Sequence, residues 1–264
     1  MWAEFLALWL AGLLFACTLM ALIWRLAVRI GNAGIVDIAW AAGFAPIALL
    51  YAVAGSGAGS RRVLIAAMVG LWSLRLALYL YVRVKSTHPR EDRRYARLRA
   101  EWGSQVNRKM LGFFELQAVL LALLSVPFVL ICLNPQPRLQ PLEWIGVALW
   151  VVAVGGEALA DRQLQRFRAA PANRTAVCQV GLWRYSRHPN YFFEWLVWVA
   201  YFVLALNSRA GWLTIYCPAL MLYFLLRVTG IPLTEQLSLE SKGSAFAEYQ
   251  RRTSAFVPWF RKQA

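Results

Sequence analysis

Residues 181–207, GLWRYSRHPNYFFEWLVWVAYFVLALN, lead from a basic, aromatic loop directly into an apolar run. The run over 190–207 has the length of a helix that crosses a hydrocarbon core about 30 Å thick. Pro189 suits the first turn of that helix, because its missing N–H costs nothing there. Glu194 would lie within the span, where a carboxylate is costly and indicates a functional site.

Apolar runs of this kind recur along the 264-residue chain, of which 60% is hydrophobic. They are continuous and do not alternate with polar residues, which excludes a transmembrane barrel and favours helices. The predicted spans are roughly 4–24, 34–54, 62–82, 113–133, 142–160, 190–207 and 211–229. We therefore predict an all-α, polytopic membrane protein, in which residues 1–264 form one membrane domain with a seven-transmembrane-helix bundle. The first span is expected to be retained, because it lacks the positive start and small-residue cleavage site of a signal peptide.

The net charge of +15 comes from basic residues that lie between the apolar runs. Because these residues do not form one polar face, we exclude nucleic acid as a partner and expect membrane lipids instead. Basic loops follow the first, third and fifth spans and recur in the tail. By the positive-inside rule this face is cytoplasmic and the N-terminus lies outside. Arg61 and Arg62 are the exception, since they fall on the opposite face.

Two polar segments are expected outside the bilayer. The sequence EDRRYARLRAEWG, at 91–103, predicts a short amphipathic helix. The tail beyond Gly230 and Pro232 is too amphipathic to span, and we expect it to fold back as a cytoplasmic cap. His88, in the loop before the amphipathic helix, is expected to be solvated.

The four cysteines form no CxxC pair, and three lie in or beside apolar runs. We therefore predict free thiols that act neither as disulfides nor as metal ligands. They are Cys17, Cys132, Cys178 and Cys217.

Few ionisable residues fall within the spans, and most of them lie near the predicted cytoplasmic face. They are Asp37, Arg75, Glu157, Asp161, Glu194 and Arg227. Asn190 and Glu194 are four residues apart and share one helix face. Glu157, Asp161 and Arg168 form a second stripe. We predict that these stripes meet at a common site open to the cytosol.

The start of the 190–207 span has the chemistry of an anion site. Free backbone N–H groups and the helix dipole favour negative charge there. Arg187, His188 and Tyr191 add donors, and Glu194 can accept from an amide or a hydroxyl one turn deeper. A ligand with phosphates at the rim and a polar ring or sugar inside fits this arrangement.

Several motifs resemble the steroid 5-alpha-reductase superfamily, and more closely its bacterial branch, the DUF1295 type. They are GLWRYSRHPNYFxE at 181–194, DxxLxxFR at 161–168, FxxYx₇VPWF at 246–260, VDIAWAAGF at 36–44 and RxxxYLxxR at 75–83. The resemblance implies a seven-helix enzyme of the bacterial inner membrane. Such an enzyme uses NADPH to reduce a conjugated carbon–carbon double bond in a lipophilic, steroid- or lipid-like substrate.

The resemblance also implies site residues. Region 157–260 would be the cofactor-binding half, with Asp161, Arg168, Tyr185, Asn190, Glu194 and Arg227 at cofactor-contacting positions. From the residues themselves we add Arg187, His188, Tyr191, Glu235 and Tyr249. The superfamily grips the substrate ketone with a Gln-Glu pair in its second span, and this chain lacks that pair. Asp37 lies in that region instead, and the resemblance implies that Tyr79 stands for a tyrosine of the third span that also grips the ketone. These two residues are the predicted catalytic acids.

Two other interpretations stay open. An S-adenosylmethionine-dependent membrane methyltransferase shares an RHPxY stretch and a C-terminal glutamate, for which Glu235 is the candidate. A transporter or lipid-binding scaffold is the other alternative. Transport is disfavoured because the polar groups gather at one face and the chain shows no inverted repeat.

Overall fold

The computed structural model describes residues 1–87, 90–173 and 176–261, so the prediction for His88 lies outside the described residues. Within these ranges the chain is helical, and its only bridge of β type joins Ser186 to Ser254. The chain divides into two compact units. Unit 1 comprises Met1–Gln140 with Asn207–Gly211, and unit 2 comprises Pro141–Leu206 with Trp212–Ala264.

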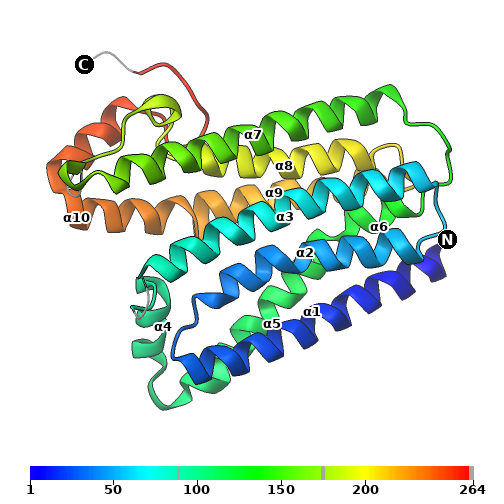
Figure 1. Cartoon of the computed structure of the whole chain (residues 1–264), viewed down its shortest axis with the longest axis horizontal. Coiled ribbons are helices and arrows are strands. Elements are labelled where there is room, and N and C mark those ends of the chain that lie inside the picture. Colours follow the sequence, from blue (N-terminus) through cyan, green and yellow to red (C-terminus); the bar gives the residue numbers. More distant parts are fainter. Residues whose placement is uncertain (88–89, 174–175, 262–264) are drawn as a thin grey trace. The chain divides into compact units, whose positions relative to one another are not determined.

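Unit 1 is built from helical elements, the longest of which run antiparallel to one another (Figure 1). They are α1 (Trp2–Ile30), α2 (Ile35–Ala54), α3 (Gly59–Thr87), α4 (Arg93–Trp102), the 3₁₀ turn η1 (Gly103–Gln105), α5 (Val106–Leu124) and α6 (Val126–Cys132). Side-chain hydrogen bonds link these helices. Trp9 Nε1 donates to the Ala122 carbonyl at 2.9 Å, and the Tyr51 hydroxyl lies 3.1 Å from Ser125 Oγ. Ser125 and Pro127 mark the break between α5 and α6.

Unit 2 is built around the pair α7 (Pro141–Ala169) and α8 (Pro189–Ala205). Between them lie two 3₁₀ turns, η2 (Pro171–Asn173) and η3 (Gly181–Arg184). The chain continues through η4 (Gly211–Ile215), α9 (Tyr216–Tyr223), the π-helical turn η5 (Phe224–Val228) and α10 (Ile231–Arg252). Gly156 allows α7 and α8 to approach, because a Cβ there would overlap the Phe193 ring.

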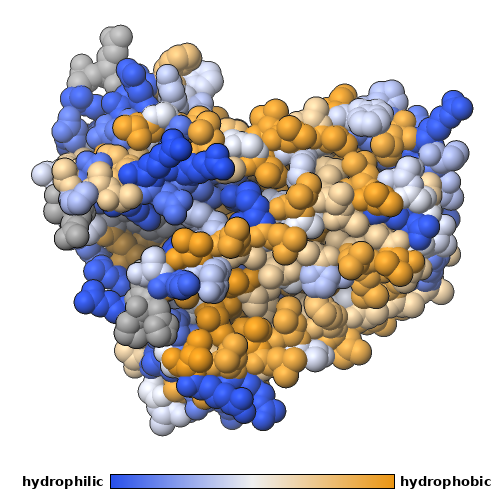
Figure 2. Space-filling view, viewed as in Figure 1, coloured by the Kyte–Doolittle hydropathy of each residue, from blue (hydrophilic) through white to orange (hydrophobic). Residues whose placement is uncertain are grey.

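Among the described residues, six stretches are long and apolar enough to cross a membrane, which indicates a multi-pass membrane protein. They are Trp2–Ile30, Ile35–Ala54, Gly59–Ser86, Arg93–Cys132, Pro141–Ala169 and Gly211–Arg252. Apolar residues cover much of the length of the helices, and hydrophilic residues gather toward their ends (Figure 2). The span predicted at 190–207 forms α8, whose 17 residues rise about 26 Å, somewhat less than the hydrocarbon thickness.

The helix predicted at 91–103 is confirmed as α4, and the Asp92 side chain caps it by accepting from the Arg94 N–H at 3.0 Å. The fourth predicted span, 113–133, begins earlier and is broken into α5 and α6. The seventh, 211–229, consists of the 3₁₀ turn η4, the short helix α9 and the π-helical turn η5. All four cysteines are free.

Candidate functional site

Buried polar side chains follow the contact between α7 and α8. Helix α7 places Glu157 and Asp161 one turn apart, and α8 places Asn190 and Glu194 one turn apart. The carboxylate residues are only 3%, 5% and 8% exposed, for Glu157, Asp161 and Glu194 respectively. Asn190 Nδ2 donates to Asp161 Oδ1 at 3.4 Å, which ties the two stripes together. The predicted convergence of Asp161 with Asn190 is therefore present.

The polar row continues deeper along the same two helices. Trp198 Nε1 donates to Glu194 Oε1 at 3.0 Å, and Trp150 Nε1 donates to the Tyr201 hydroxyl at 3.1 Å. Trp198 and Tyr201 are fully buried. We did not predict Trp150, Trp198 or Tyr201 from the sequence. The signal was available for two of them, since positions 194, 198 and 201 continue the Asn190 stripe at helical spacing.

A second polar cluster joins the loop before α8 to helix α10. Arg187 Nε donates to Glu235 Oε1 at 2.6 Å, and Arg187 Nη2 donates to Oε2 at 3.2 Å. Arg187 Nη1 donates to the carbonyls of Gln250, at 2.9 Å, and Thr253. Every nitrogen of this guanidinium therefore holds a partner within the protein, and we assign Arg187 to holding α10 and the tail.

His188 belongs to the same cluster. Its Nε2 lies 3.1 Å from Glu235 Oε1, and its ring stacks on Tyr191 with centroids 5.3 Å apart. Burial lowers the pKa of His188; the nearby Glu235 opposes this and Arg187 adds to it. The imidazole is thus kept neutral at neutral pH, and it adds no cation to the cluster.

The loop 181–187 is fixed from both sides. Trp183 Nε1 donates to the Ala160 carbonyl of α7 at 2.9 Å. The Tyr249 hydroxyl of α10 donates to the carbonyls of Trp183 and Ser186, the latter at 3.1 Å. The Arg187 N–H donates to the Ser254 carbonyl at 2.8 Å. Tyr249 is therefore part of the framework that holds this loop.

The remaining predicted cofactor residues lie at the surface of unit 2. Arg168, at the end of α7, and Arg227, in η5, are both exposed. Tyr185 is 39% exposed, and its ring meets Phe260 edge-on at 6.4 Å. A π-helical turn such as the one that carries Arg227 is often found at functional sites.

The two predicted catalytic residues lie in unit 1, on α2 and α3. Asp37 accepts from Arg94 Nη2 at 2.7 Å and from the Tyr95 hydroxyl at 2.5 Å. The Asp37 carboxylate is therefore bonded within the protein, to Arg94 and Tyr95. Tyr79 is half-buried.

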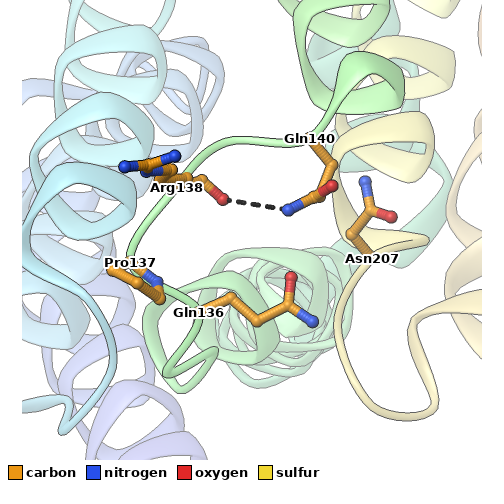
Figure 3. Close-up of a pocket in the computed structure, with 5 residues that line it drawn as sticks. All are labelled: Gln136, Pro137, Arg138, Gln140 and Asn207. Atoms are coloured by element: carbon orange, nitrogen blue, oxygen red, sulfur yellow. Dashed lines mark hydrogen bonds between the residues drawn. The ribbon is translucent and has the colours of Figure 1, made fainter.

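A cavity of about 450 Å³ lies elsewhere in unit 1 (Figure 3). It is lined by Gln136, Pro137, Arg138, Gln140 and Asn207. None of the predicted site residues lines it, so it forms no part of the candidate site. Among the residues described, no group of three or more histidine, cysteine or acidic side chains is placed to hold a metal ion.

Comparison with known proteins gives a family but no function. A family model described as "Protein of unknown function (DUF1295)" matches residues 23–253. "Uncharacterized protein C594.04c" of Schizosaccharomyces pombe (strain 972 / ATCC 24843) is 26% identical over 279 residues, which covers 94% of this chain and 78% of the relative. No solved structure matches the chain. The family match includes every predicted site residue, from Asp37 to Tyr249.

Proposed function

The chain belongs to the DUF1295 family of unknown function, and from this premise we propose that it is a membrane-embedded, NADPH-dependent reductase. Its substrate would be a lipophilic, steroid- or lipid-like molecule with a conjugated carbon–carbon double bond. Kinship with the steroid 5-alpha-reductases is part of this proposal. The observation that supports it most is the row of buried carboxylates, joined by the Asn190 amide, between α7 and α8, because polar groups there are costly and mark functional sites.

The residues of this row suit the amide and hydroxyl groups of a dinucleotide. Among the described residues, the buried Asn190 Oδ1 has no hydrogen-bond partner, so it is an acceptor for an incoming N–H or O–H. Glu194 and Asp161 are buried acceptors on the same two helices. Exposed Arg168 and Arg227 could neutralise phosphates. When bound, NADPH would supply a hydride.

The other predicted residues have supporting parts in this proposal. Arg187, His188, Glu235 and Tyr249 are bonded to one another or to the loop before α8, so they would position Asn190 and Glu194 through that loop. Tyr191 and Tyr185 would border the cofactor site. The Tyr79 hydroxyl is the proposed donor to the substrate carbonyl, and Asp37 would act only if its bond to Arg94 opened.

The proposed topology has seven spans, with α8 as the sixth, the N-terminus outside and α10 with the tail as a cytoplasmic cap. Arg61 and Arg62, which oppose this orientation, donate hydrogen bonds to backbone carbonyls of the protein. Arg61 is fully buried and donates to the carbonyls of Gln136 and, at 2.7 Å, Arg138. Arg62 Nη1 donates to the Ala52 carbonyl at the end of α2, at 3.0 Å. Their charges are held by local carbonyls, so they are weak evidence against the positive-inside rule.

The S-adenosylmethionine-dependent methyltransferase is the second candidate. The cluster of Arg187, His188 and Glu235 supports it, because it brings together the RHPxY stretch and the C-terminal glutamate on which that resemblance rests. Four of the five N–H donors of Arg187 are bonded within the protein, which counts against a carboxylate ligand at that position.

Ligand binding separates the two candidates. The full chain, purified in detergent, would be tested for thermal stabilisation by NADPH, NADH and S-adenosylmethionine. A ligand at 100 times its dissociation constant stabilises the folded state by about 2.7 kcal/mol, which a melting curve resolves. We expect a shift with NADPH. A shift with S-adenosylmethionine alone would establish the methyltransferase, and no shift with any of the three would reject both.

A further inference from the structure

The last described residues of unit 2 present large aromatic side chains to the outside. Trp259 and Phe260 are 67% and 77% exposed, the highest values of any described aromatic residue, and the adjoining Tyr185 is 39% exposed. We call these three residues the aromatic edge. Rings of this size normally lie in a core or against another apolar phase, so a cluster of exposed ones indicates an interaction surface.

The aromatic edge is held in place by its backbone. The Trp259 N–H donates to the Tyr185 carbonyl at 2.9 Å, and Ser186 Oγ donates to the Phe256 carbonyl at 2.8 Å. Arg261 Nε donates to the Arg184 carbonyl at 3.1 Å. The chain that carries the rings is therefore anchored on both sides of Trp259, and the rings face outward from a fixed position.

The segment 256–260 also has a defined height along the axis of α8. Phe256 packs on Phe192 and Trp195, with ring centroids 5.6 and 5.9 Å apart, and both belong to the first two turns of α8. Trp259 follows Phe256 by three residues, a reach of about 10 Å at most. The headgroup layer is about 5–8 Å deep on each side of the hydrocarbon. If α8 enters the membrane with its apolar run, the aromatic edge lies at the level of the headgroups.

Two cations flank the aromatic edge. Arg184 adjoins Tyr185, and Arg261 adjoins Phe260. Arg261 Nη2 donates to the neutral Gln179 Oε1 at 2.6 Å. Among the residues described, neither guanidinium is in ion-pair distance of a carboxylate, so both keep their positive charge for an outside partner. Amphipathic rings next to cations are what anionic membrane surfaces bind.

We propose that the aromatic edge, with Arg184 and Arg261, docks on the headgroup region of an anionic lipid bilayer and ties the C-terminal cap of unit 2 to the membrane. The proposal depends on α8 being a span, but it is independent of any cofactor or reaction.

Photo-crosslinking would test it in the full chain. Benzoylphenylalanine replaces Trp259 in protein reconstituted in nanodiscs of phosphatidylcholine, with or without phosphatidylglycerol, and mass spectrometry identifies the adducts after irradiation. The same probe at Leu14, which is 69% exposed on α1, is the lipid control, and at Glu248 on α10 it is the water control. We expect lipid adducts at position 259 and an increase in their yield with phosphatidylglycerol.

A variant that lacks one of the two cations tests whether docking depends on charge. A cation near an anionic surface changes binding about fivefold, so Arg184→Gln should reduce the phosphatidylglycerol-dependent gain by about that factor. The absence of lipid adducts at position 259 while Leu14 yields them would overturn the proposal. So would adducts to a second protein chain, or equal yields in the two lipids.

Discussion

Glu194 is a buried carboxylate in the second turn of α8. Its position within an apolar run predicts a site, and the side chain is buried and bonded to Trp198. A carboxylate in this setting can bind a ligand or can stabilise the fold. The two roles are separable, because Gln keeps the shape and the acceptor while it removes the charge.

We predict that Glu194→Gln weakens NADPH binding about 10-fold, because a hydrogen bond to a charged carboxylate is about twice as strong as one to a neutral amide. Thermal stability without ligand should change little. Glu143→Gln is the matched control, since Glu143 is also a buried glutamate of this helix pair but lies at the first turn of α7. Binding titrations on the three proteins measure the effect. Equal affinity in wild type and Glu194→Gln would remove Glu194 from the site.

His188 predicts a dependence of stability on pH. Its folded pKa is lowered below the unfolded value of about 6.5, so the unfolded chain binds more protons as pH falls through that value. Stability should therefore fall on acidification below about pH 6.5. The groups that face the ring are Glu235, Arg187 and Tyr191.

His188→Gln keeps a donor for Glu235 and cannot titrate. We expect wild type to lose more of its thermal midpoint than this variant between pH 7.5 and 5.5. An equal loss in both proteins would show that other groups govern the acid response.

At the level of elements, the close contact of α7 and α8 depends on Gly156. Adding a methyl group there should push Phe193 away and cost about 1–3 kcal/mol, as overpacking usually does. The adjacent Gly155 is exposed, and a Cβ added to it would meet no atom within 4 Å. Gly155→Ala should therefore be neutral or should stabilise by up to about 1 kcal/mol. Unfolding curves of the two variants measure this difference, and equal effects would contradict the packing described.

Helix positions were largely predictable from the sequence, because continuous apolar runs of membrane length have few other solutions. The break between α5 and α6 was missed, although Pro127 pointed to it. The partners of Arg187 could not be predicted, because Glu235 and Thr253 lie 48 and 66 residues away and local spacing carries no information on such contacts. For the same reason Arg94 was not foreseen as the partner of Asp37.

For the whole molecule, labelling of single cysteines in two loops measures the orientation in the membrane. Ser56, between α2 and α3, and Ser104, in η1 after α4, are both exposed, and α3 lies between them in the chain. With the N-terminus outside, Ser56→Cys should react with a membrane-impermeant maleimide in intact cells. Ser104→Cys should react only after permeabilisation. The reverse pattern would show that the protein has the opposite orientation. The native protein is the control for labelling of its own four cysteines.

Arg61 has a consequence for biosynthesis. Its carbonyl acceptors at Gln136 and Arg138 leave the ribosome about 75 residues after it does. While the first three helices are being inserted, these two carbonyls are not yet available to Arg61, and we expect the cation to contact water or the insertion machinery. We expect a stalled nascent chain that ends before Gln136 to keep a cysteine at position 61 reactive toward a water-soluble maleimide, and the completed chain to protect it.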